Sequence, residues 1–252
     1  MKIGFTTTSF RQIRDKTKIV EIARRCGADI LEWGGDVHVK SLFDARHVKL
    51  LCDGAGIGIS SFGSYYRVGS GKRDDWRKIC DIAAAMGCHG VRVWLGVKDS
   101  QKTNEATYLA LVEDGQSICD TAAEYGLKVC CECHDNTFNN DTDAFLKIRE
   151  EIGRENFRTY FQSRYRRKEY DMDRIERTLP FIESVHVSYS EQRREQFPHC
   201  DGAYLDALLD RLLKCGFDGN LLVEYTYLFS HLGVPAAMQR DIEKIRMRVN
   251  KQ

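Results

Sequence analysis

The chain has 252 residues, which matches the usual size of one eight-stranded α/β barrel and is short for two typical α/β domains. Its 38 Lys and Arg residues nearly balance its 37 Asp and Glu residues, so the net charge of +1 creates no global field that would favour nucleic acid or an anionic membrane. Residues 1–10 contain no long apolar run, so we expect neither a signal peptide nor a membrane span. Ten scattered cysteines without an export signal indicate a reducing, cytoplasmic setting.

Short apolar segments alternate with amphipathic segments along the whole chain, and several of the amphipathic segments end at a glycine. In chain order, the predicted strands are 2–7, 28–33, 57–62, 90–95, 127–133, 159–163, 185–189 and 220–225. The predicted helices between and after them are 16–26, 43–53, 74–86, 105–125, 143–152, 173–181, 203–215 and 236–249. Strict alternation of eight strands with eight helices predicts parallel strands joined by right-handed crossovers.

We therefore predict an α/β fold of the (β/α)₈ TIM-barrel type. With only 3 prolines and no low-complexity tract to mark a linker, we expect one domain over residues 1–252. An open doubly wound sheet is the alternative. It is less favoured because no G-x-G-x-x-G motif follows the first strand, and Gly54, Gly56 and Gly58 lie in a turn between a helix and a strand.

Two cysteines in the fifth predicted strand, Cys130 and Cys133, form a C-x-x-C pattern. No second pair follows, and the apolar alternation continues through them, so we interpret them as strand residues rather than as a redox or zinc motif.

Charged and imidazole side chains interrupt strands whose residues should be mostly apolar, because barrel strands are buried on both faces. These residues are Glu32, Arg92, Glu132, His134, His186 and Glu224. Alternation with a period of two puts Glu132 and His134 on one side of the fifth predicted strand. We expect Glu32 and Arg92 to pair inside the barrel. A lone strand histidine is usually a satisfied core residue, but Glu132, His186 and Glu224 fall near the C-terminal ends of three separate strands, where barrel enzymes place their active sites. Two glutamates and a histidine meeting there suit a divalent cation, or proton transfer on either side of a bound carbonyl.

The residues around these positions resemble the xylose-isomerase-like barrels, a family that includes sugar phosphate isomerases and epimerases, ketose 3-epimerases and endonucleases. Leu127 to His134 looks like the family's fifth strand, with a glutamate followed two places on by a histidine. Val185-His186-Val187 looks like its seventh strand, and Asp206 to Glu224 looks like its closing helix, turn and eighth strand. The resemblance covers nearly the whole chain.

The resemblance implies a divalent metal ion (Mn²⁺, Mg²⁺, Co²⁺ or Zn²⁺) held by Glu132, His186, Glu224 and a residue of the sixth strand. The family has an aspartate on that strand, whereas this chain has Gln162, within Tyr160-Phe161-Gln162-Ser163-Arg164. A glutamine can coordinate through its carbonyl oxygen but brings no charge, and charge count tunes such sites. The seventh strand also lacks the family's frequent Lys-Asp after the histidine.

The leading functional hypothesis is an isomerase or epimerase of a sugar, sugar phosphate or related polyol ketone, with Glu132 and Glu224 transferring protons through an enediolate. His134, Trp94 and Arg164 are the predicted substrate contacts, although the arginines of residues 164–167 and 193–194 fit solvated loops equally well. The alternatives are a keto-sugar lyase or dehydratase and a barrel that binds a sugar without converting it. The extra metal ligands and basic surface that an endonuclease needs are not seen in the sequence, so we expect a carbohydrate partner and neither nucleic acid nor membrane, and a homo-oligomer stays open.

Overall fold

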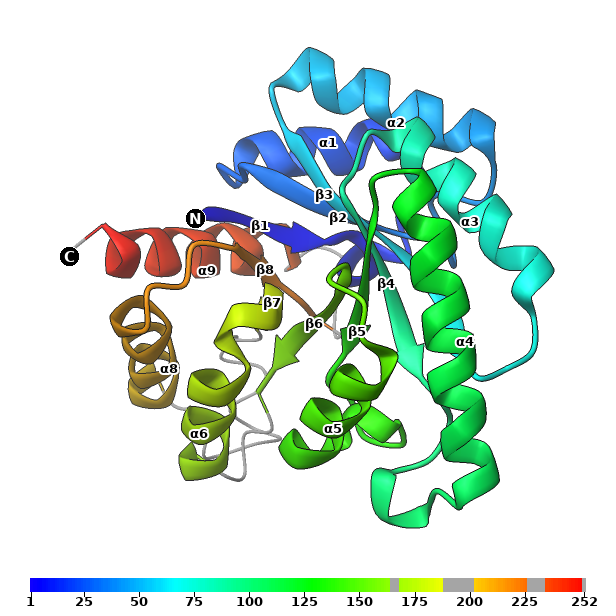
Figure 1. The fold of residues 1–252 in the computed structure, drawn as a ribbon. Helices are drawn as coiled ribbons and strands as arrows, with labels where there is room; N and C mark the ends of the chain where they lie inside the picture. The colour runs from blue at the N-terminus through cyan, green and yellow to red at the C-terminus, as the bar shows by residue number, and fades with distance from the viewer. Residues whose placement is uncertain (164–167, 188–201, 226–233, 251–252) are drawn as a thin grey trace.

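The strands close into a barrel in the order in which they occur along the chain (Figure 1). The structure is a computed structural model that describes residues 1–163, 168–187, 202–225 and 234–250. The eight strands are β1 (Lys2–Thr6), β2 (Ile30–Gly34), β3 (Gly58–Val68), β4 (Gly90–Leu95), β5 (Lys128–Glu132), β6 (Phe157–Gln162), β7 (Ile182–Val187) and β8 (Asn220–Val223). Every neighbouring pair is parallel, including β1 with β8, so the predicted closed barrel is confirmed.

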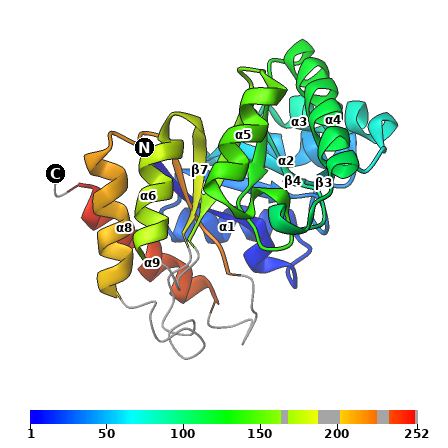
Figure 2. The ribbon, with the colours of Figure 1, turned by 60° about the horizontal axis from the view of Figure 1, so that its bottom comes forward.

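Helices surround the barrel, with α6, α8 and α9 grouped on one side of it and α3, α4 and α5 on another (Figure 2). The α-helices of the described residues are α1 (Lys16–Arg25), α2 (Leu42–Ala55), α3 (Arg73–Met86), α4 (Glu105–Glu124), α5 (Thr142–Ile152), α6 (Lys168–Thr178), α8 (Gly202–Lys214) and α9 (Val234–Val249). Side-chain N-caps begin several of them, as at Asp15, Ser41 and Asn104. The glycine stops predicted from sequence are also present: Gly56 and Gly87 adopt the left-handed conformation after α2 and α3.

Several boundaries differ from the sequence-based expectation, among them those of β3, α6 and β5. β3 continues to Val68, six residues beyond the predicted end at 62, and its pairing with β4 shifts register between Gly63 and Arg67. α6 begins at Lys168 rather than at 173. β5 ends at Glu132, so His134 lies beyond the strand.

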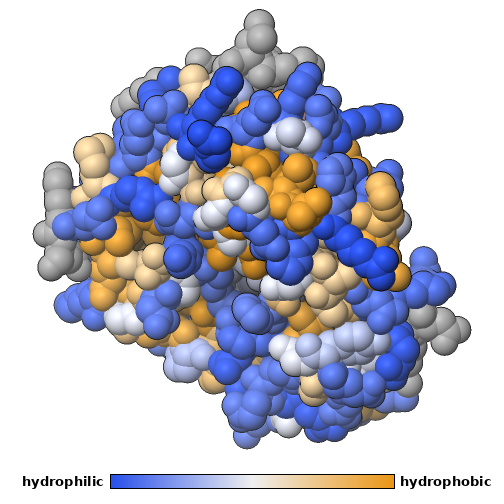
Figure 3. Space-filling view, turned by 90° about the horizontal axis from the view of Figure 1, so that it is seen from above, coloured by the Kyte–Doolittle hydropathy of each residue, from blue (hydrophilic) through white to orange (hydrophobic). Residues whose placement is uncertain are grey.

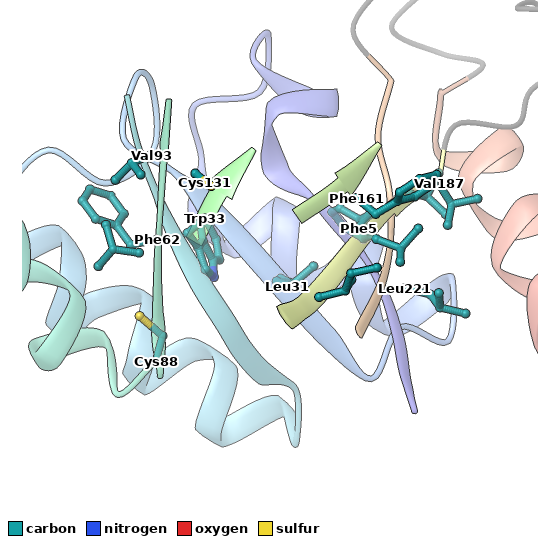
Figure 4. Packing of buried hydrophobic residues seen from close by; sticks show 14 of the residues in the cluster. Phe5, Leu31, Trp33, Phe62, Cys88, Val93, Cys131, Phe161, Val187 and Leu221 are labelled. Carbon is teal, nitrogen blue, oxygen red and sulfur yellow. The ribbon is translucent and has the colours of Figure 1, made fainter. Parts of the chain in front are cut away.

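Side chains alternate between the two surfaces of the barrel wall, as the period of two requires. One set packs outward against the helices in the main hydrophobic core. Figure 4 shows part of this core, with Cys88 from the segment before β4 and the strand residues Phe5, Leu31, Trp33, Phe62, Val93, Cys131, Phe161, Val187 and Leu221. The other set forms a much smaller apolar cluster of Cys130, Tyr160 and Leu222, packed against Ile30. The residues of this second cluster occupy the alternate strand positions whose side chains fill the barrel interior. The charged strand residues occupy positions of the same alternation, so their side chains also point inward.

The cysteines of the described residues are all free, and eight of these nine are buried. Burial raises the pKa of the Cys130 thiol well above its usual value, which makes it a poor nucleophile. Cys130 is a strand residue as interpreted, whereas Cys133 lies just beyond the end of β5.

The face seen from above is largely hydrophilic, with hydrophobic groups between the hydrophilic ones (Figure 3). Large exposed hydrophobic residues on α2 include Phe43 and Leu50. None of the helices in the described part of the chain is both long and apolar enough to cross a lipid bilayer.

Candidate active site

Three predicted site residues lie at the C-terminal end of the barrel. Glu132 is the last residue of β5, His186 is the next-to-last residue of β7, and Glu224 directly follows β8. All three are buried, with exposed fractions of 2%, 1% and 5%. They occupy inward-facing positions, since Glu132 and His186 alternate in phase with the interior residues Cys130 and Ser184.

The three side chains offer one ligand atom each within 4.8 Å of one another. His186 Nδ1 lies 3.1 Å from Glu132 Oε1 and 3.5 Å from Glu224 Oε2. Atoms bound to one ion at about 2.1 Å stand about 3.0 Å apart in an octahedral arrangement and about 3.4 Å apart in a tetrahedral one. The two separations from His186 Nδ1 are therefore close to those between ligands of one divalent cation.

The opposite ring nitrogen of His186 points toward Glu32 of β2. His186 Nε2 makes no hydrogen bond within the described residues and lies 3.7 Å from Glu32 Oε1. Burial opposes the charged imidazolium, but the carboxylates of Glu224, Glu132 and Glu32 raise the pKa of His186 to about 10. A carboxylate behind the imidazole is the arrangement that usually orients a metal-binding histidine.

Arg92 of β4 connects two of these carboxylates. Its Nε donates to Glu32 Oε1 at 3.0 Å and its Nη1 donates to Glu132 Oε2 at 2.5 Å. Burial opposes ionisation of both acids, but Arg92 and His186 hold the pKa of Glu132 well below its usual range and lower that of Glu32 to about 2. The predicted pairing of Glu32 with Arg92 is confirmed. The second ion pair of Arg92, with Glu132, was not predicted.

A glycine in β3 leaves room for the guanidinium. A Cβ atom at Gly63 would lie 2.8 Å from Arg92 Nη2, so any larger residue would displace the arginine. Ser61, two residues before Gly63 in β3, donates to Glu32 Oε2 at 3.0 Å. Glu32 is wholly buried, and these contacts compensate the charge that burial would otherwise penalise.

The indole of Trp94 also donates to Glu132, from Nε1 to Oε2 at 2.6 Å. Arg92 and Trp94 therefore share one carboxylate oxygen, while the other oxygen, Oε1, faces His186. This division fixes the carboxylate plane and directs Oε1 into the cluster.

Gln162, the last residue of β6, contacts the third site residue. Its Nε2 donates to Glu224 Oε2 at 3.1 Å, and Thr8 Oγ1 approaches Glu224 Oε1 at 3.5 Å. Gln162 pairs in register with His186, so its side chain lies beside the predicted metal ligands. Its role as a fourth ligand stays a prediction.

The predicted substrate contacts have different positions in the structure. His134 was expected to share a strand face with Glu132, but β5 ends first, and His134 is exposed with its ring 5.8 Å from that of Trp94. Trp94 is half-buried beside Glu132. Arg164 lies outside the described residues.

Sequence reasoning did not identify Thr8 as part of the site, and it left open whether Tyr65 stacks on a sugar ring or merely packs. Tyr65 lies in the part of β3 beyond the predicted strand, where the register shifts, and its φ of 59° is unusual for a residue other than glycine. Its ring makes an edge contact with Trp94, with centroids 5.3 Å apart. The only sequence signal was the aromatic pair Tyr65-Tyr66 directly after the third predicted strand.

Residues 20–246 match the model of the family described as xylose isomerase-like TIM barrel. No curated protein matches the chain significantly. Among solved structures, the fold is similar to the probable 3-DHS dehydratase AsbF of Bacillus anthracis, which is involved in petrobactin synthesis (TM-score 0.79, 17% identity, 95% of this chain and 98% of that one). It is also similar to D-psicose 3-epimerase of Clostridium cellulolyticum H10 (TM-score 0.79, 15% identity, 99% of both chains). A third similar structure is D-allulose 3-epimerase of a Methylomonas species (TM-score 0.76, 14% identity, 98% of both chains).

Proposed function

Because the chain belongs to the xylose isomerase-like TIM barrel family, we propose that it is a metal-dependent isomerase or epimerase of a sugar, sugar phosphate or related polyol ketone. The observation that carries this proposal is the buried cluster of Glu132, His186 and Glu224, whose ligand atoms lie within 4.8 Å of one another at the C-terminal end of the barrel. Epimerases of ketoses among the structures with similar folds support the same class of substrate.

Glu132 Oε1, His186 Nδ1 and Glu224 Oε2 are the atoms that would hold the ion, with the Gln162 carbonyl oxygen as a neutral fourth ligand. A divalent ion such as Mn²⁺, Mg²⁺, Co²⁺ or Zn²⁺ supplies Lewis acidity that polarises a substrate carbonyl. The chain's own residues then have to supply orientation and proton transfer.

Glu132 and Glu224 are the proposed proton-transfer pair. They come from β5 and from the end of β8, which are separated by β6 and β7 around the ring, so a substrate between them presents opposite faces to the two carboxylates. Removal of the proton beside the carbonyl by one glutamate and its return by the other gives epimerisation. Return by the same carboxylate to the neighbouring carbon gives aldose–ketose exchange.

The surrounding contacts orient these two acids. Arg92 and Trp94 hold Glu132 ionised, which is the form that can accept a proton, and Gln162 holds Glu224 by a hydrogen bond. Trp94 and the exposed His134 stand at the edge of the site, where they would contact the substrate.

Solvent exchange tests the proposal directly. Incubation of the Mn²⁺-loaded protein with a panel of ketoses and ketose phosphates in D₂O should place deuterium on the carbon beside the carbonyl of at least one of them. The variants E132Q and E224Q should each lose about 10²–10⁴-fold in rate, because the amide cannot accept a proton. Metal content must be measured in the same samples. E183Q is a matched control, since Glu183 pairs with Lys128 through a half-exposed contact away from the cluster.

Other outcomes would support the other candidate functions. A product that has lost water would indicate a dehydratase, the activity named for the similar AsbF structure. Isomerisation without deuterium uptake would indicate a hydride shift on the same scaffold. Binding without exchange or turnover across the panel would contradict an enzyme and favour a sugar-binding barrel, with the neutral Gln162 as the residue responsible.

A further inference from the structure

A second group of polar side chains lies beside the carboxylate cluster, at the C-terminal ends of β1, β2 and β3. Arg11 follows the short helix after β1, Asp36 follows β2, and Tyr65 lies in the extended part of β3. Arg11 Nε donates to Asp36 Oδ2, and Arg11 Nη2 donates to the Tyr65 hydroxyl at 2.5 Å. All three side chains are half-buried. We call them the Arg11 triad.

The Arg11 triad adjoins the cluster along two routes. Through Tyr65, it contacts the edge of the Trp94 ring, and Trp94 donates to Glu132. Through Asp36, it approaches the short helix Thr7–Phe10 that follows β1: a Cβ atom built at Gly34 would lie 2.9 Å from Asp36 Oδ1 and 3.3 Å from the Thr8 methyl group. Thr8 in turn contacts Glu224, so Thr8 and Trp94 lie between the triad and the two proposed proton-transfer residues.

Tyr65 is held in a costly backbone conformation. A φ of 59° strains the backbone of a residue with a bulky side chain, and such strain concentrates at functional sites. Ser64 stabilises the turn, because its hydroxyl donates to the Arg92 carbonyl and accepts from the Tyr66 amide. The turn places the phenol against both Arg11 and Trp94, and the Arg92 guanidinium lies 5.6 Å from its ring.

The charges of the triad decide which ligand it suits. Arg11 and Asp36 form an ion pair, so their charges nearly cancel. Their side chains are 36% and 26% exposed, so a ligand can contact both. A phosphate would meet the Asp36 carboxylate and be repelled by it. Sugar hydroxyls both donate and accept, so they match a carboxylate beside a guanidinium, whose five N–H donors are only partly used by the two described bonds.

We propose that Arg11, Asp36 and Tyr65 form a subsite that binds neutral hydroxyl groups at the end of the ketose remote from its carbonyl, with Trp94 packing against the carbon chain between. This assignment rests on the proposed function for the position of the carbonyl, at the carboxylate cluster. It predicts that the triad discriminates ketoses by chain length and contributes nothing to binding of the carbonyl end.

Tryptophan fluorescence can measure this binding without turnover. Trp33 and Trp76 are buried, with exposed fractions of 0% and 1%, whereas Trp94 is half-buried at the site and should provide the signal. The probes are the ketohexose D-fructose, the shorter ketotetrose L-erythrulose and D-fructose 6-phosphate, each titrated into Mn²⁺-loaded protein. W94F should remove the response and so assign it.

The affinity of the wild type for D-fructose should be at least about tenfold higher than its affinity for L-erythrulose, because one hydrogen bond to a charged group contributes about that much to binding. R11Q and D36N should each remove most of this preference and leave L-erythrulose binding unchanged within about twofold. R154Q is the control, because Arg154 forms an exposed ion pair with Asp120 elsewhere on the molecule and should keep the preference.

Equal weakening of both ketoses in R11Q and D36N would overturn the subsite, as would no change in either or no binding of either by the wild type. A selective loss of D-fructose 6-phosphate in R11Q would show a phosphate site instead and contradict the proposal. The solvent-exchange assay distinguishes a failure of the proposed subsite from a failure of the proposed enzymatic function. Chain-length preference without exchange leaves the subsite standing and rejects the enzyme, whereas exchange with no effect of R11Q or D36N rejects only the subsite.

Discussion

Arg92 Nη1 lies 2.5 Å from Glu132 Oε2, with both side chains about 97% buried from solvent (3% exposed). A buried arginine therefore compensates the charge of a carboxylate that we also assign to metal binding and proton transfer. Two buried charges in contact are tolerated only as a pair, because either one alone would carry the full penalty of desolvation.

The first prediction concerns this pair. R92L should lower the free energy of unfolding by about 3–5 kcal/mol, because it removes the buried guanidinium that pairs with both Glu32 and Glu132 and leaves His186 as their neighbouring cation. Urea denaturation monitored by circular dichroism measures the change. R154L, which breaks an exposed ion pair, should cost no more than about 1 kcal/mol. A loss from R92L as small as that of R154L would mean that the two acids find other compensation.

The second prediction is a pH dependence of the metal-free protein. The folded-state pKa of His186 is raised from 6.5 to about 10, so its protonated form stabilises the fold fully below pH 6.5. This contribution should be lost progressively as the pH rises from 6.5 toward 10. The H186Q variant cannot titrate there. The difference in unfolding free energy between wild type and H186Q should therefore shrink over this range, and a constant difference would contradict a charged His186.

A related prediction concerns metal binding. A histidine with a pKa of about 10 is protonated at pH 7, and a metal can bind its Nδ1 only after the proton leaves. Binding of Mn²⁺ at pH 7 should release about one proton. Calorimetry in buffers of different ionisation enthalpy counts that proton. A count of zero would indicate that His186 is neutral in the metal-free protein or that it does not bind the ion.

The barrel and the convergence of three side chains were predictable because both depend on local patterns. Alternating apolar and amphipathic segments define the strands and helices, and parallel strands bring Glu132, His186 and Glu224 to one end. The ion pair of Glu32 with Arg92 followed from the same logic, since neither charge has another reason to occupy a strand.

The features that could not be predicted from the sequence depend on strand register and on the residues at which the strands end. The register shift between Gly63 and Arg67 extends β3 and turns Tyr65 toward Trp94, and no period-two pattern encodes such a shift. His134 was placed beside Glu132 by alternation alone, which fails because β5 ends at Glu132. The second ion pair of Arg92 required knowing that Gly63 leaves space for the guanidinium.

The last prediction tests Gln162, whose amide now has a known partner. Gln162 Nε2 donates to Glu224 Oε2, so Q162E replaces a hydrogen bond with two carboxylates in contact. In the metal-free protein this should lower the free energy of unfolding by about 1–3 kcal/mol. With the ion bound, the same carboxylate becomes a charged ligand, and Mn²⁺ affinity should rise by about tenfold or more, since ligand charge count tunes such sites. Q162D adds the same charge on a stem one methylene shorter, so it should tighten binding less if reach is limiting.

Two measurements on one set of variants test whether Gln162 binds the ion: urea denaturation without metal, and competition with a chelator for Mn²⁺. Q162M is the matched control, because methionine has a similar length but neither a donor nor a charge, so it should lose stability without gaining affinity. Opposite signs of the two effects in Q162E, with no gain of Mn²⁺ affinity in Q162M, would place Gln162 at the ion. If Q162E is destabilised and its Mn²⁺ affinity is unchanged or weaker, then Gln162 serves only to position Glu224, and the three remaining residues hold the ion alone.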